Sequence, residues 1–85
     1  MPSVRVTLLS KPGCHLCDAA RDAVTGVIAE SGLEASIEEL SILDDPDLNA
    51  RYWDEIPVVL INDKVHTIWR VDPERFAAAL KEQGT

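Results

Sequence analysis

Two cysteines separated by two residues are the side chains of this sequence most able to do chemistry. Cys14 and Cys17 are the only cysteines among the 85 residues. At this spacing, across a loop-to-helix junction, two sulfur atoms lie close enough to form a disulfide that can open and close. The predicted chemistry is therefore thiol–disulfide exchange, with Cys14 as the attacking nucleophile and Cys17 as the resolving thiol.

The predicted helix start beside Cys14 favours this chemistry. Ser10–Gly13 contains Pro and Gly and predicts a loop, after which a helical pattern begins. The unpaired N–H groups and the positive dipole end of a helix start stabilise a thiolate. Lys11 adds positive charge, whereas Asp18 opposes the thiolate by like-charge repulsion. We expect the attraction to dominate, because a solvated Asp18 carboxylate is screened.

Two residues near Cys14 have predicted roles in the same chemistry: Cys17 and His15. Cys17 lies one helical turn further on, so we expect it to be less exposed and to attack the mixed disulfide. A cationic His15 would tune the pair by stabilising the neighbouring thiolate. The alternative is that His15 is a solvated residue of the helix start.

The elements that must position these cysteines follow from hydrophobic periodicity and from turn residues. Leu16, Ala20 and Val24 recur at helical steps, and Asp45-Pro46 and Asp72-Pro73 each combine a helix cap with Pro at the first helical position. The predicted elements are a strand over 4–9, a helix from 14 or 15 to about 30, a strand over 35–42, a helix from 46 to about 54, a hairpin of strands over 57–61 and 65–69, and a helix from 73 before a frayed tail over 82–85.

Composition limits the kind of protein and its partners. Apolar residues make up 46% of the chain, which is enough for one compact core, so we predict a single domain over residues 1–85. A formal charge of −7 opposes binding to nucleic acid and to anionic membranes. The start Met1–Arg5 has no signal-peptide core, which predicts a cytoplasmic protein, and we expect it to act as a monomer.

The sequence resembles glutaredoxins and small glutaredoxin-like proteins in two motifs. These are Lys11–Cys17 after the first strand and Ile56–Val59 before the hairpin. The element order β-α-β-α-β-β-α is similar to the thioredoxin fold, an α/β fold with a four-stranded mixed sheet flanked by helices. The resemblance implies a thiol–disulfide oxidoreductase whose substrates are disulfide-bearing proteins or small thiols.

The resemblance also implies roles for residues outside the cysteine pair. Lys11 and Pro57 would belong to the active site, and the Ile56-Pro57 bond would be cis and face the disulfide. The base rate for bonds before Pro predicts trans instead. The backbone of Ile56 would pair with an extended thiol substrate, as in strand addition.

One segment departs from the resemblance. Glutaredoxins usually carry a Gly-Gly pair and nearby acids after the fourth strand, which help to bind glutathione, whereas this chain has Thr67–Asp72, with Trp69 and Arg70 in it. We predict that Trp69 is a core residue, with a groove-lining position as the alternative; the same question applies to Tyr52 and Trp53. We expect no bound cofactor, and glutathione or another low-molecular-weight thiol as reductant.

Three other interpretations compete with redox turnover. Cys-x-x-Cys is half of a structural zinc site, although only His15 and His66 could add soft ligands. Cys14 of two chains could instead bridge an iron–sulfur cluster. A third interpretation is a thioredoxin-fold adaptor that binds partners without redox turnover. The presence of both cysteines argues against it.

Overall fold

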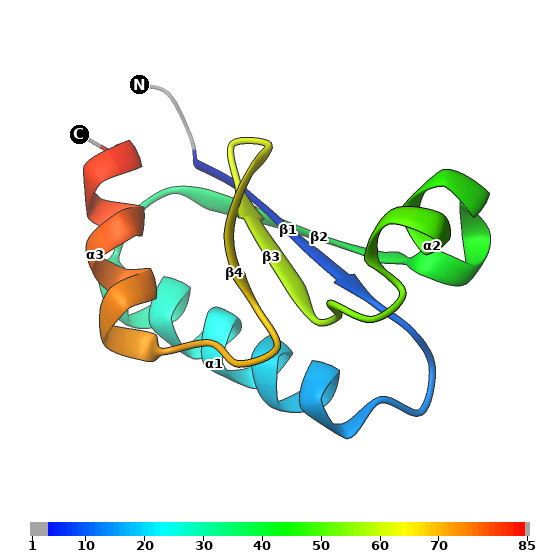
Figure 1. Ribbon diagram of the computed structural model, residues 1–85. Coiled ribbons are helices and arrows are strands. Elements are labelled where there is room, and N and C mark those ends of the chain that lie inside the picture. Colours follow the sequence, from blue (N-terminus) through cyan, green and yellow to red (C-terminus); the bar gives the residue numbers. More distant parts are fainter. Residues whose placement is uncertain (1–3, 85) are drawn as a thin grey trace.

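The chain folds into a four-stranded sheet packed with helices, as the computed structural model in Figure 1 shows for residues 4–84. The elements in order are β1 (Val4–Ser10), α1 (His15–Ser31), β2 (Ala35–Ser41), the 3-10 turn η1 (Ile42–Asp44), α2 (Pro46–Tyr52), β3 (Val58–Ile61), β4 (Lys64–Ile68) and α3 (Pro73–Gly84). The predicted order β-α-β-α-β-β-α is confirmed. Two predictions fall partly on residues 1–3 and 85, which lie outside the described residues: the start without a signal-peptide core and the frayed tail.

The sheet has the strand order β2-β1-β3-β4. β1 and β2 are parallel and joined by the crossover through α1, whereas β3 runs antiparallel to both of its neighbours. Leu9 near the end of β1 pairs with Val58 at the start of β3, which pairs with Ile68 at the end of β4. The loops that contain Cys14, Pro57 and Trp69 therefore lie at the same end of the sheet, where β1 and β4 finish and β3 begins (Figure 1).

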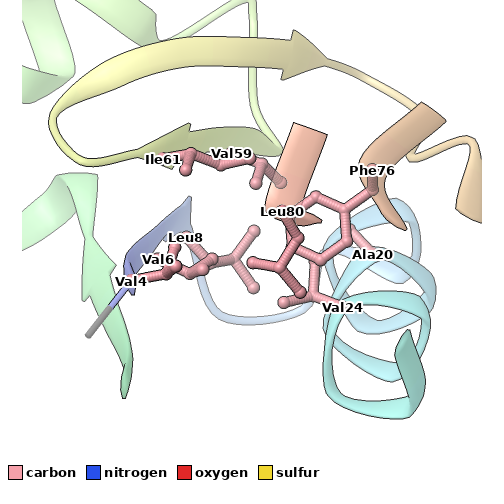
Figure 2. Close-up of a cluster of buried hydrophobic side chains, with 9 residues drawn as sticks. All are labelled: Val4, Val6, Leu8, Ala20, Val24, Val59, Ile61, Phe76 and Leu80. Carbon is pink, nitrogen blue, oxygen red and sulfur yellow. The ribbon is translucent and has the colours of Figure 1, made fainter. Parts of the chain in front are cut away.

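One face of the sheet is covered by α1 and α3, which pack side by side. Alternate residues of β1 and β3 point to this face and meet apolar residues of both helices (Figure 2). Burial of each such side chain contributes about 1.5–3 kcal/mol relative to an exposed one. We call this set the helix-side core; its buried members are Val4, Val6, Leu8, Ala20, Val24, Val59, Ile61, Phe76 and Leu80.

The opposite face carries a smaller cluster covered by short elements. Leu48 and Tyr52 of α2 and Ile42 of η1 contribute to it. We call it the site-side core; its buried members are Leu9, Cys17, Ile42, Tyr52, Ile56 and Val58, and Cys14, Leu48, Leu60 and Ile68 pack against it partly buried. Because Cys17 is a member, the redox pair is tied directly to this cluster.

Several element ends differ from the prediction by a few residues. β2 ends at Ser41, since its hydroxyl accepts a hydrogen bond from the N–H of Leu43 and opens η1. α2 ends at Tyr52, two residues early, and α3 continues to Gly84 where a frayed tail was predicted. In the hairpin, the pairing between β3 and β4 skips His66, which forms a β-bulge. Within residues 4–84, no helix is long and apolar enough to cross a membrane.

Candidate active site

Cys14 is the residue that caps the N-terminus of α1. Its backbone is extended, with φ −91° and ψ 111°, and its Sγ accepts a hydrogen bond from the N–H of Cys17 at 3.3 Å. Gly13 precedes it with φ +78°, a left-handed conformation that glycine adopts without steric cost. The loop thus turns the sulfur of Cys14 toward the unpaired amides of the helix start, the arrangement that favours a thiolate.

Cys17 lies one turn into α1 and is completely buried, whereas Cys14 is partly exposed. Both cysteines are free thiols in this structure. Burial, followed by hydrogen bonding to Cys14, raises the pKa of the Cys17 thiol from 9.0 to about 11, and a backbone hydrogen bond from Lys11 partly offsets this. The predicted difference in exposure between the two cysteines is confirmed: Cys14 is partly accessible to solvent, and Cys17 is not.

The Ile56-Pro57 segment lies at the same edge of the sheet as the cysteines. Its peptide bond is cis, as the resemblance implied and against the base rate for bonds before Pro. Pro57 is fully buried, and Ile56 belongs to the site-side core against which Cys14 packs. The structure therefore brings Cys14, Cys17 and Ile56 into one cluster, and Pro57 follows Ile56 directly in the chain.

The two predicted basic residues flank the pair on exposed surface. Lys11 lies in the loop before Cys14, with its side chain exposed and its backbone directed at the sulfur of Cys17. His15 is the first residue of α1 and is also exposed. Both side chains thus lie on the exposed surface close to Cys14 in sequence.

A polar cluster under the Lys11–Gly13 loop was not predicted. Arg21 of α1 donates two hydrogen bonds to the carboxylate of Glu39 on β2, at 2.5 and 2.6 Å, and a third to Asp18 at 2.9 Å. The hydroxyl of Ser10 donates to the same Glu39 carboxylate at 2.8 Å. The hydrogen bonds from Arg21 hold the pKa of the Glu39 carboxyl below its ordinary value.

This cluster bears on the cysteines in two ways. The Asp18 carboxylate, which was expected to oppose the thiolate, is solvent-exposed as predicted and is paired with Arg21. A hollow of about 330 Å³, bordered by Lys11, Gly13 and Glu39 among others, connects the loop to the cluster. Local periodicity places Arg21 one helical turn after Cys17 and Glu39 on the same strand face as Ile37, but no local pattern brings these two residues together.

The prediction that Trp69 is a core residue is wrong. Trp69 follows β4 with φ +67°, and its side chain is 55% exposed. Its backbone N–H donates to the carbonyl of Pro57 at 2.8 Å, and its indole Nε1 donates to the carbonyl of Asp54 at 3.0 Å. The left-handed backbone turns the indole away from the sheet and onto the loop before β3. Of the two other aromatic residues in question, Tyr52 is buried and Trp53 is exposed.

The zinc interpretation requires further metal ligands beside the two cysteines. Among the residues that the structure describes, no three His, Cys, Asp or Glu side chains gather closely enough to hold an ion. Four ligands are usual in a structural zinc site. Between residues 4 and 84, therefore, Cys14 and Cys17 lack the further ligands that zinc would need.

Comparisons with known proteins agree with this fold. An uncharacterised protein of Mycobacterium tuberculosis is 28% identical over 81 residues, which are 92% of this chain and 84% of that protein. The X-ray structure of protein XcR50 from X. campestris has a TM-score of 0.74 at 28% identity, and covers 91% of this chain and 96% of that one. Thioredoxin-2 of the malaria parasite has a TM-score of 0.68 at 14% identity, over 94% of this chain and 82% of that one, which shows the fold alone.

The architecture and the cysteine pair thus define a protein of thioredoxin fold. The profile of the family described as Glutaredoxin-like domain (DUF836) matches residues 5–81, and this chain belongs to that family. Membership of a glutaredoxin-like family supports a redox function in general terms.

Proposed function

We propose that this protein is a thiol–disulfide oxidoreductase that uses Cys14 and Cys17 as a dithiol/disulfide pair. The observation that carries the proposal is the difference between two sulfur atoms on one helix turn. Cys14 is partly exposed at the capping position, and Cys17 is buried behind it. An accessible nucleophile with an inaccessible partner in reach is what a two-step exchange requires.

In the first step, the Cys14 thiolate attacks one sulfur of a substrate disulfide. A bond forms between the Cys14 sulfur and that substrate sulfur, the substrate S–S bond breaks, and the second substrate sulfur leaves as a thiolate. The exposed side chains of Lys11 and His15 would stabilise the attacking thiolate as cations. The backbone of Ile56 would pair with the substrate chain, and the fully buried Pro57 would hold that backbone in position.

In the second step, Cys17 loses its proton and attacks the Cys14 sulfur of the mixed disulfide. The Cys14–Cys17 bond forms, and the remaining substrate sulfur leaves as a thiolate. The substrate has gained two electrons and the pair has lost two. Burial raises the pKa of the Cys17 thiol, so this step depends on removal of its proton to solvent.

The pair is reset by an external reductant. Two molecules of a low-molecular-weight thiol such as glutathione would reduce the Cys14–Cys17 bridge and become a disulfide themselves. A reducing compartment such as the cytoplasm supplies that chemistry. We propose no resident cofactor, and a monomer suffices because both sulfurs come from one chain.

A trapping experiment tests the proposal. A disulfide-bearing peptide is added to the reduced wild type, to Cys17→Ser and to Cys14→Ser, and the products are separated by mass under non-reducing conditions. We expect the wild type to release reduced peptide and Cys17→Ser to accumulate a covalent adduct at Cys14. An adduct that forms equally well in Cys14→Ser, or its absence in all three proteins, would contradict the assigned roles.

A further inference from the structure

Trp69 is the exposed side chain whose conformation most needs an explanation. A bulky residue with φ +67° lies in a sparsely populated and strained backbone region, and such residues cluster at functional sites. The indole is nevertheless held in place, because the backbone N–H bonds Pro57 and the Nε1–H bonds Asp54. It is therefore a fixed apolar surface that remains 55% exposed.

Trp69 is anchored to the segment that the proposed function assigns to substrate. Its hydrogen bond to the Pro57 carbonyl places it directly beside the cis Pro. Ile68, the residue before it, and Cys14 both pack against the site-side core. A peptide that pairs with the Ile56 backbone while its sulfur meets Cys14 must therefore pass close to the indole.

Two further large apolar side chains are exposed at this edge of the sheet. Leu16, between the two cysteines, is 46% exposed, and Trp53, at the end of α2, is 64% exposed. We call Leu16, Trp53 and Trp69 the apolar rim. Leu16 is a sequence neighbour of both cysteines and Trp69 is hydrogen-bonded to Pro57, so these side chains offer apolar contact area beside the segment assigned to substrate.

The charges around the rim indicate what it would bind. The loops that bear the two tryptophans carry three carboxylates, Asp54, Glu55 and Asp72, against one cation, Arg70, and the whole chain has a formal charge of −7. Glutathione disulfide is itself a net anion, so like-charge repulsion disfavours it. A neutral or basic polypeptide with an apolar side chain suits both the charge and the rim.

We propose, on the basis of the proposed function, that Trp69 is a specificity-determining residue of this site. It selects disulfides in extended polypeptide segments that carry an apolar residue next to the reacting cysteine, in preference to glutathione disulfide. The exchange itself is the two-step reaction described above; Trp69 contributes contact area to the substrate and exchanges no electrons or protons.

Three probes separate this preference from general reactivity. Two neutral peptides, identical except for Leu or Ser beside the cysteine, are each joined by a disulfide to the same chromophoric thiol, and glutathione disulfide is the third probe. We expect wild-type kcat/KM to be about tenfold higher for the Leu peptide than for the Ser peptide, the size of effect that one apolar contact produces.

Variants of Trp69 and a matched control sharpen the test. Trp69→Gly suits the positive φ and should fold, and we expect it to abolish the Leu preference, because kcat/KM falls further for the Leu peptide than for the Ser peptide or glutathione disulfide. Trp69→Phe should retain most of the preference. Val65→Ala removes an equally exposed apolar residue at the far end of β4 and should change nothing.

Two results would overturn the proposal. One is a Leu preference that survives in Trp69→Gly, and the other is an equal loss of kcat/KM on all three probes.

A binding measurement distinguishes failure of the role of Trp69 from failure of redox turnover itself. In a Trp53→Phe background, the fluorescence of Trp69 should respond to a Leu peptide whose cysteine is replaced by Ser, and not to its Ser counterpart. Docking without reduction would contradict the proposed function alone, and an absent response would contradict the role of Trp69.

Discussion

The helix-side core and the site-side core use the same sheet for different purposes. The helix-side core is closed by two long helices and consists entirely of hydrocarbon side chains (Figure 2). The site-side core is covered by the seven-residue α2 and by η1, and it includes Cys17. The comparison indicates that stability is concentrated on one face, while the other face leaves an edge open for chemistry.

The largest effect expected is on the site side, at Cys14. Cys14→Ser should lower turnover by about a thousandfold or more, because a serine hydroxyl at neutral pH is a far weaker nucleophile than a thiolate. Its thermal unfolding should match that of the reduced wild type, since Cys14 is only partly buried. Disulfide reduction and calorimetry on the same samples check both statements. A large loss of stability would show that the two faces are not separate.

The matching change on the helix side is Phe76→Ala. Phe76 is fully buried between α3 and the sheet and contacts the His66 ring at a centroid distance of 5.8 Å. Loss of this side chain should destabilise the fold by about 3–5 kcal/mol. Denaturant unfolding measures the loss, and the reactivity of Cys14 with an alkylating agent, per folded molecule at low temperature, should stay within about twofold of wild type.

Alkaline pH acts on the site side through Cys17. Because folding raises the pKa of this thiol from 9.0 to about 11, the native state favours the neutral form. The resulting stability is complete below pH 9.0 and is lost as the pH rises toward 11. Chemical unfolding of the reduced protein from pH 8 to 11 should show a loss that Cys17→Ala lacks. Equal losses in both proteins would place the titration elsewhere.

The smallest effect expected concerns Glu39, which belongs to neither core and joins β2 to α1 through Arg21. Its pKa is lowered by Arg21, so its stabilisation is present above the ordinary carboxyl value of 4.5 and is lost as the pH falls below it. Glu39→Gln should cost about 1 kcal/mol at neutral pH, since the pair is partly exposed and screened. Unfolding at pH 7 and pH 3 measures this; the difference between wild type and Glu39→Gln should shrink at the lower pH.

The parts of the molecule that could be predicted from the sequence are those determined by local patterns. The helical stripe of α1, the Asp-Pro starts of α2 and α3 and the apolar strands predict the fold. The Cys14–Cys17 spacing predicts the helix-start geometry, because capping is a local property of the chain.

The features that were missed depend on contacts between distant residues. The ion pair of Arg21 with Glu39 and the hydrogen bond of Trp69 to Asp54 join residues on different elements. The position of Trp69 depends on a left-handed backbone that nothing in its own sequence requires. Its hydrophobicity therefore predicted a core residue, where the structure has an exposed one.

The most direct test of the central claim is an equilibrium titration of the cysteine pair. Purified protein is held in buffers of graded thiol–disulfide ratio, free thiols are alkylated, and modified cysteines are counted by mass spectrometry. The proposed function predicts one reversible transition in which Cys14 and Cys17 gain or lose both labels together, and which disappears in Cys14→Ser. A pair that stays fully reduced or fully oxidised across the whole range would contradict redox turnover.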